Sequence, residues 1–234
     1  MTAMTGGGGT PHDAASGLDD DAIGALREIL TDPAVPVGGT LSQHPGIEPS
    51  EGRRIAALRE AHDYLTSRRV AAVAAQSGDA ATRLIASLGE VDEALAGTLH
   101  WHAVLASTIA SLPATRARNA VLGDVSRGEL LTWGTRARSW AWTEAADPIG
   151  KVDAEFETDE FPGLYDALVV WEPAAGLVVV PTHRERVGWE PIRPLRPSGS
   201  WVVRLAHATV HADEVIPVAS HPCDLVTWRE KDPT

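Results

Sequence analysis

The spacing and type of the apolar residues change near Gly128, and this change constrains the fold more than any other sequence feature. Before Gly128 the apolar residues recur at helical spacing, as Leu84, Leu88, Leu95 and Leu99 do. After it, short β-branched or aromatic runs are bounded by proline and glycine, which is typical of strands. Because helices come first and strands second, the sequence predicts an α+β protein with a helical bundle followed by a β part.

Several helices are expected in the first half. The segment Leu18 to Leu30 has apolar residues on one face, which predicts a short amphipathic helix. A longer helix is expected to begin at Ser50, which we interpret as a plain N-cap. From Ala80 to Leu112 the apolar residues are so dense that we expect a helix buried on most sides. Pro113 then opens a last helix before the strands begin.

The strands of the second half are expected to form a small antiparallel β-barrel. Leu164–Trp171 and Gly176–Pro181, with a short proline-containing connection between them, have the pattern of a hairpin. The four Gly residues at 6–9 lie in a segment that buries too little surface to offset its ordering entropy. We therefore predict a disordered tail at 1–17, a helical domain at 18–128, a β-barrel domain at 129–220 and a C-terminal tail at 221–234.

Composition excludes several classes of protein. The net charge of -12 disfavours wholesale binding to nucleic acid or to an anionic membrane surface. No apolar run approaches the roughly 20 residues that span a bilayer, and the first residues lack the basic and apolar regions of a signal peptide. The expected compartment is the cytoplasm. The single cysteine, Cys223, excludes an internal disulfide and a cysteine zinc cluster.

The histidine pairs do not have metal-binding spacing. His100 and His102 would lie about 200° apart around a helix axis. His207 and His211 would lie roughly 13 Å apart along a strand. Neither pair can hold one ion, so no metal is expected.

Seven stretches occur in a particular order along the chain: Gly89–Ala96, Leu99–His102, Arg127–Leu130, Tyr165–Val170, Gly176–Val180, Arg196–Ser200 and Val210–Pro217. In residue type and order they resemble the N-terminal helical and middle β domains of the acyl-CoA dehydrogenase family. The resemblance covers roughly residues 50–218. The chain ends about where the third, helical domain of that family would begin, and a truncated subunit is therefore expected.

The resemblance implies an oxidoreductase that acts on the CH–CH group of an acyl-CoA through bound FAD. By position, the flavin contacts would be Trp142, Thr143 and Glu144, and the substrate contacts would be Ser198 and Ser200. The resemblance also implies a homo- or hetero-oligomer, in which a partner chain would supply the third domain and its catalytic base. The family includes flavin monooxygenase relatives, so dehydrogenase and monooxygenase chemistry both stay open.

The chain also departs from the family pattern. The flavin-contacting motif, a TEP followed by a Gly/Ser-rich turn and Asp, is present only as Thr143-Glu144-Ala145-Ala146-Asp147. No residue can be assigned as the catalytic base. The alternative is a degenerate binding or scaffold subunit that has lost flavin, in which Trp140 and Trp142 fill one face of a strand. For either function, a barrel face left bare by the missing domain would be apolar and would bind a partner.

Overall fold

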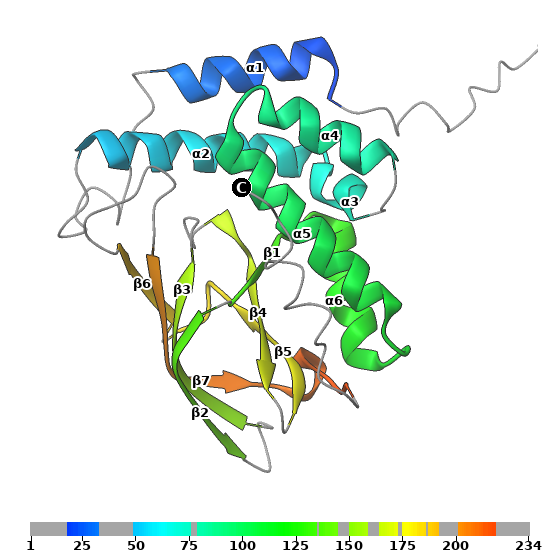
Figure 1. Cartoon of the computed structure of the whole chain (residues 1–234), viewed down its shortest axis with the longest axis vertical. Helices are drawn as coiled ribbons and strands as arrows, with labels where there is room; N and C mark the ends of the chain where they lie inside the picture. The colour runs from blue at the N-terminus through cyan, green and yellow to red at the C-terminus, as the bar shows by residue number, and fades with distance from the viewer. Residues whose placement is uncertain are drawn as a thin grey trace, which may run out of the picture.

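In the computed structural model of this chain, the described residues are 18–32, 49–75, 79–134, 136–144, 150–158, 164–172, 175–185, 187–191 and 201–218. Within them, six α-helices precede eight strands. Figure 1 shows α1 and α2 stacked above the strands, with α5 and α6 running down beside them. The α+β class with helices first is confirmed. The tails predicted at 1–17 and 221–234 lie outside the described residues, and so do Ser198 and Ser200.

The helices follow the amphipathic pattern of the first half of the sequence. Asp19 caps the first helix, because its carboxylate accepts a hydrogen bond of 2.8 Å from the N–H of Ala22. None of the helices in the described part of the chain is long and apolar enough to cross a membrane. The helices are α1 (Asp20–Thr31), α2 (Pro49–Ser67), α3 (Val70–Ala74), α4 (Asp79–Gly89), α5 (Glu93–Ser111) and α6 (Arg116–Arg127).

Two helix boundaries differ from the sequence prediction. The dense apolar stretch from Ala80 to Leu112 is not one helix, because α4 ends at Gly89 and α5 begins at Glu93. Asp92 starts the second helix as its N-cap in an extended conformation. The helix predicted to begin after a Ser50 cap begins at Pro49, so Ser50 lies inside its first turn. Proline suits this first helical position, where its missing N–H costs nothing.

The strands form two four-stranded sheets, which we call sheet A and sheet B. Sheet A has the order β1-β4-β5-β8 and consists of β1 (Leu131–Trp133), β4 (Ala167–Glu172), β5 (Gly176–Pro181) and β8 (Val215–Ile216). Sheet B has the order β2-β3-β7-β6 and consists of β2 (Arg136–Glu144), β3 (Gly150–Thr158), β7 (Trp201–Val210) and β6 (Val187–Pro191). The predicted hairpin is confirmed, since β4 and β5 pair antiparallel with Glu172 opposite Gly176.

The expected closed antiparallel barrel is corrected in two respects. β1 pairs parallel with β4, with Leu131 opposite Ala167. No ladder between the described strands joins sheet A to sheet B. The two sheets instead pack face to face, and side chains of β4 and β5 share one apolar cluster with side chains of β3 and β7.

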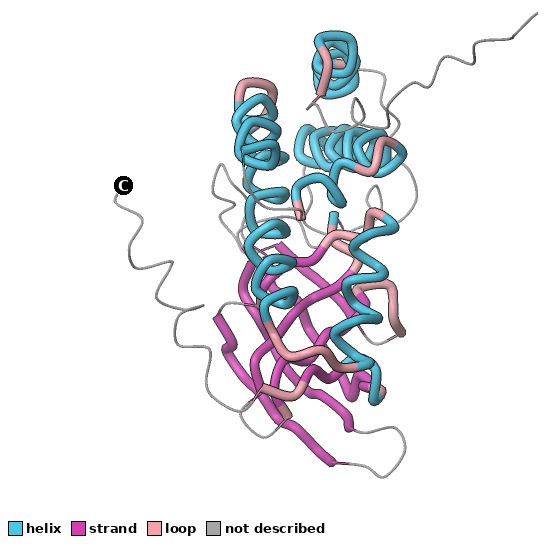
Figure 2. Tube along the Cα trace, turned by 90° about the vertical axis from the view of Figure 1, so that its right-hand side faces the viewer, coloured by secondary structure: helices cyan, strands magenta, loops and turns pink. Residues whose placement is uncertain are grey.

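Sheet A is the middle layer of three. One set of β4 and β5 side chains packs against α5 and α6, and the alternate set packs against sheet B. Figure 2 shows these helices in front of the strands, in agreement with their place beside the strands in Figure 1. Burial on both faces explains why these two strands read as unbroken apolar runs. The first set is Ala167, Val169, Leu177 and Val179, and the second is Leu168, Val170, Val178 and Val180.

Candidate functional site

The residues expected to contact flavin lie at the end of β2, on an edge of sheet B. Trp142 is opposite Val152, Thr143 is opposite Lys151 and Glu144 is opposite Gly150. Successive side chains of a strand point to opposite faces. Trp142 is half-buried and packs in the cluster between the two sheets, whereas Thr143 is exposed on the outward face. The side chain of Glu144 lies outside the described part of the chain. The side chains of Trp142 and Thr143 therefore do not share one binding surface.

A glycine holds the indole of Trp142 in place. A Cβ atom added at Gly150 would lie 2.5 Å from Cζ2 of Trp142, so the ring lies directly over this glycine on the neighbouring strand. Cross-strand contact between an aromatic ring and a bare glycine is a known way to fix register. Trp142 thus has the packing that the core-filling interpretation predicts.

The outward face of sheet B is polar, and two of its carboxylates are paired. Glu155 accepts a hydrogen bond of 2.8 Å from Nε of Arg204. The carboxylate of Asp153 accepts a bond of 2.8 Å from the backbone N–H of His207 and lies 2.6 Å from its Nδ1. Asp153 and Glu155 are alternate residues of β3, and their partners Arg204 and His207 lie on the neighbouring β7. The apolar face expected on the β part is therefore not found on these two strands, because their outward positions carry ion pairs.

His207 lies in a bulge that the sequence did not reveal. The register between β3 and β7 shifts between Val152 and Ala154, and His207 has a φ of 52°, in the left-handed region. The expectation that His207 and His211 lie on one regular strand is wrong for this reason, and also because β7 ends at Val210. The two hydrogen-bonding contacts from Asp153 stabilise this unusual backbone.

His102 is fully buried where α5 meets α3 and β1. Its Nδ1 accepts a hydrogen bond of 3.0 Å from the N–H of Leu131, so its Nε2 carries the proton and donates to the carbonyl of Ala71 at 3.1 Å. Burial lowers the pKa of His102 to about 4. His102 is thus a neutral link between the helices and sheet A, and a structural residue rather than a metal ligand.

Glu129, between α6 and β1, has a raised pKa. The main cause is burial, and the carboxylates of Asp124 and Asp166 add to it. Asp166 is itself held in place by the N–H of Leu130, which donates to its Oδ2 at 2.8 Å. Perturbed carboxyls often mark functional sites. Glu129 lies in the connection between α6 and β1, however, and not on β2, which carries Thr143.

Two hollows lie among the helices. A small one of about 10 Å³ lies beside His62, Thr66 and Thr98 and has room for about one water molecule. A larger one of about 230 Å³ lies between α1 and α2 and is lined by Leu30, Asp32, Arg53, Arg54 and Ala57. No residue of β2 lines either hollow.

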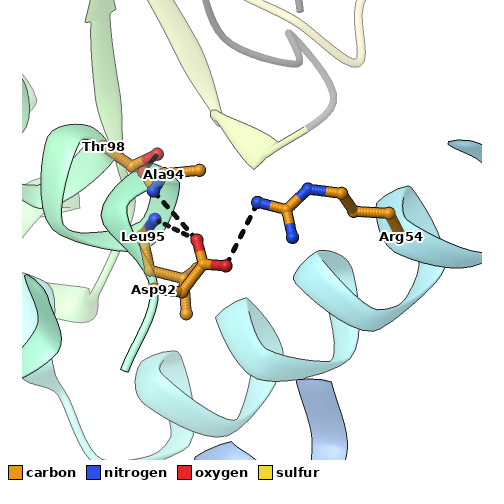
Figure 3. A network of polar contacts seen from close by, with 5 residues as sticks. All are labelled: Arg54, Asp92, Ala94, Leu95 and Thr98. Carbon is orange, nitrogen blue, oxygen red and sulfur yellow. Dashed lines mark hydrogen bonds and ion pairs between the residues drawn. The ribbon is translucent and has the colours of Figure 1, made fainter. Parts of the chain in front are cut away.

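Arg54, beside the larger hollow, is engaged in holding two helices together. Figure 3 shows its guanidinium reaching the Asp92 carboxylate, at 3.1 Å, while Oδ1 of that carboxylate accepts from the N–H groups of Ala94 and Leu95. The same carboxylate therefore caps α5 and ties it to α2. We assign this network to structure and not to ligand binding.

Comparison with protein-family models finds no match, and comparison with curated proteins finds none either. Comparison with solved structures does find relatives. A glutaryl-CoA dehydrogenase from Mycobacterium smegmatis in complex with FADH2 is 14% identical, with a TM-score of 0.51 over 90% of this chain and 58% of that one. The ChsE4-ChsE5 complex from Mycobacterium tuberculosis is 15% identical, with a TM-score of 0.53 over 94% of this chain and 60% of its match. KijD3 in complex with dTDP is 13% identical, with a TM-score of 0.55 over 91% of this chain and 60% of that one.

These likenesses define the class of fold. The chain has the acyl-CoA dehydrogenase fold over about nine tenths of its length, and it spans less than two thirds of each of these three relatives. At such low identities the likeness is one of fold, and the same fold can carry different activities.

Proposed function

We propose that this chain is an acyl-CoA dehydrogenase-like flavoprotein subunit that binds FAD and acts together with a partner chain. The supporting observation is the fold shared with a glutaryl-CoA dehydrogenase in complex with FADH2, over 90% of this chain and 58% of that protein. The remainder of such an enzyme would come from the partner. The occurrence of the fold in the ChsE4-ChsE5 complex supports an assembly of this kind. The proposed compartment is the cytoplasm.

The outward face of β2 fits one part of this cofactor. Thr143 presents an exposed hydroxyl, and the exposed Lys151 lies directly opposite it on β3. Opposite residues of an antiparallel pair have Cβ atoms about 5 Å apart, so the hydroxyl of Thr143 and the ammonium group of Lys151 can both reach one ligand on this face. Both can donate hydrogen bonds to the oxygen atoms of a flavin ring or a phosphate. In this proposal Trp142 supports the strand from the inner face, and Glu144 stays a candidate contact.

The chemistry of the proposed reaction explains the need for a partner. FAD, when bound, accepts a hydride from the acyl chain. A carboxylate must also remove the proton α to the thioester carbonyl. On the described outward face, Asp153 is engaged by His207 and Glu155 by Arg204. The base is therefore proposed to come from the partner chain, with Ser198 and Ser200 as proposed contacts of the acyl-CoA.

The absorption spectrum of the purified chain tests this proposal. After incubation with FAD and gel filtration, the wild-type chain is expected to retain the visible flavin bands. Thr143→Val is expected to weaken FAD binding about fivefold to tenfold, the loss of about one hydrogen bond. Ser139→Val, on the same exposed face of β2, is the matched control and should bind FAD like the wild type. A colourless wild-type protein would contradict flavin binding by this chain.

The alternative is a degenerate binding or scaffold subunit without flavin. Two observations favour it: Trp142 and Thr143 face opposite sides of sheet B, and the outward carboxylates Asp153 and Glu155 are already paired. A colourless chain that co-purifies with a longer homologue and leaves its acyl-CoA turnover unchanged would support this function. The KijD3 structure holds dTDP, so assays should include substrates other than CoA esters and should test monooxygenase as well as dehydrogenase chemistry.

A further inference from the structure

A β-bulge brings the side chain of His207 to the outward face of sheet B. In the ladder between β3 and β7, two residues, Ala206 and His207, stand opposite one residue, Asp153. Leu205 and Ala208, which flank this pair of residues, both pack in the apolar cluster between the sheets. Strict alternation along β7 would send His207 to the same inner face as Leu205. The bulge therefore turns an imidazole outward that a regular strand would bury.

The backbone of His207 is in a costly conformation that Asp153 stabilises. Its φ of 52° is in the left-handed region, which residues other than glycine rarely adopt. Oδ1 of Asp153 accepts a hydrogen bond of 2.8 Å from the backbone N–H of His207, and Oδ2 lies 2.6 Å from Nδ1 of the ring. Bulges and residues with strained backbones both cluster at functional sites. This strained bulge presents one histidine to solvent, which points to a use for that histidine.

The contact with Asp153 determines which nitrogen of the ring can act as a base. Nδ1 donates to the carboxylate, so the lone pair of the neutral ring is on Nε2. The side chain of His207 is 67% exposed, so water and a small ligand can reach the ring. A carboxylate beside Nδ1 also stabilises the imidazolium that forms when Nε2 takes a proton. The Asp153–His207 pair therefore has the arrangement of a general base for a water molecule.

The residues around this pair leave room for a small ligand and offer it a cation. Ala141 of β2 is opposite Asp153, Ala206 precedes His207, and both alanines are exposed. Lys151 is also exposed and lies two residues before Asp153 on the same face of β3, about 7 Å along the strand. Its ammonium group can stabilise negative charge that develops on an oxygen atom of a ligand.

We propose that the Asp153–His207 pair is a site for the hydrolysis of small carboxylic esters. Nε2 of His207 takes a proton from a water molecule while the water oxygen bonds to the carbonyl carbon of the ester. Lys151 stabilises the negative charge on the carbonyl oxygen. The bond from this carbon to the alcohol oxygen then breaks, and the imidazolium gives its proton to that oxygen. The products are a carboxylic acid and an alcohol. His207 is the catalytic residue and Asp153 a positioning residue.

Chemical rescue tests this proposal, with p-nitrophenyl acetate as the ester. The full chain, without added FAD, should hydrolyse the ester faster than an equal concentration of free imidazole does. His207→Gly should lower the rate at least about tenfold. Glycine suits the left-handed backbone, so this variant keeps the bulge. Added imidazole should restore part of the lost rate in His207→Gly, a response that a purely structural role of His207 would not give.

Two further variants separate positioning from general effects on the chain. Asp153→Asn keeps an oxygen for the backbone N–H of His207 but loses the carboxylate that orients the ring, so kcat should fall at least about tenfold with KM unchanged. His183→Gly removes an exposed histidine from the turn between β5 and β6 and should keep the wild-type rate. Circular dichroism of every variant checks that it is folded.

Three results would overturn the proposal. One is a wild-type chain no faster than free imidazole, which needs no variant to be observed. Another is a folded His207→Gly that is as active as the wild type or that imidazole does not rescue. The third is an unchanged kcat in Asp153→Asn, which decides the matter even if His207→Gly does not fold. The assay contains no flavin and no partner chain, so its outcome is independent of the proposed function.

Discussion

Sheet A and sheet B each have four strands, but they meet the solvent in opposite ways. Both sets of side chains on the central strands of sheet A are buried, one under α5 and α6 and one under sheet B. On β3 of sheet B only alternate residues are buried, and the residues between them, which include Lys151, Asp153 and Glu155, face solvent. Sheet A therefore supplies stability and has no described face left for a ligand. Of the two sheets, sheet B is the one whose described residues present a polar face to solvent.

The largest effect should come from neighbouring residues of β4. Leu168→Ala should lower the free energy of unfolding by about 2–5 kcal/mol, and Val169→Ala should also destabilise strongly, because the two residues face different buried layers. On β3, Glu155→Ala should cost less than about 1 kcal/mol, as expected for an exposed ion pair. Urea unfolding measures all three. If Val169→Ala proved neutral, the three-layer description of sheet A would be wrong.

The next effect is the pH dependence that His102 gives to the junction between helices and sheet A. Its pKa is about 4 in the folded protein against an ordinary value of 6.5, so the unfolded chain binds the extra proton first. The stability contribution is complete above pH 6.5 and is lost as the pH falls toward 4. The total loss is about 3 kcal/mol. Urea unfolding at a series of pH values measures it.

Two variants isolate this contribution. His102→Gln should remove the part of the pH dependence between pH 6.5 and 4, while lowering stability at neutral pH because the contacts to Leu131 and Ala71 are disturbed. His183→Gln, at an exposed position, should keep the wild-type pH dependence. An unchanged pH profile in His102→Gln would contradict the neutral, hydrogen-bonded role of His102.

A smaller difference in stability is expected between alanine substitutions at two glycines of sheet B. Gly150→Ala puts a methyl group within 2.5 Å of the Trp142 ring and should cost about 1–3 kcal/mol, as overpacking does. Gly188→Ala meets nothing within 4 Å and should be close to neutral. Thermal unfolding of both variants measures the difference, with the near-ultraviolet circular dichroism of the chain, which has eight tryptophans, as a second readout. Equal costs would mean that the indole does not depend on Gly150.

The smallest effect concerns Glu129. Since burial raises the pKa of Glu129, the charged form is disfavoured in the folded protein, and this destabilisation is present once the pH exceeds the raised pKa. Glu129→Gln should therefore increase stability slightly at neutral pH and leave it unchanged in acid. Thermal unfolding at neutral and acidic pH checks the sign. A decrease at neutral pH would indicate that the carboxylate makes a stabilising contact.

Local signals in the sequence were sufficient for much of the fold. Gly128 ends α6 in a left-handed conformation with a φ of 107°, as expected for a C-cap glycine, and the chain turns to strands after it. The β4–β5 hairpin was predicted from its apolar runs and the short connection between them. The break before α5 was missed although Asp92 is a good N-cap residue, because the apolar density on both sides concealed it.

Local signals in the sequence do not predict which distant segments pair with each other. Nothing in the three residues of β1 indicates that they pair parallel with β4, which begins at Ala167. The same limit applies to the candidate site. A strand period of two already requires Trp142 and Thr143 to face opposite sides, but only the register with β3 and β7 shows which side is buried. The bulge at His207 likewise depends on Asp153, far away in sequence.

The position of sheet A has a practical consequence for anyone who divides this chain. The clearest boundary in the sequence is at Gly128, but the segments before and after it share their hydrophobic cores. Helices α5 and α6 pack on β4 and β5. Leu88 and Leu99 lie in one cluster with Leu164 and Trp201. A fragment that ends at Gly128 would expose to water the apolar faces of α5 and α6 that pack on sheet A, and it is expected to aggregate. Split reporters, fusions and expression fragments of this protein should keep residues 18–218 together, because the same cluster also includes Leu26, Ile55 and Leu58 of the first helices.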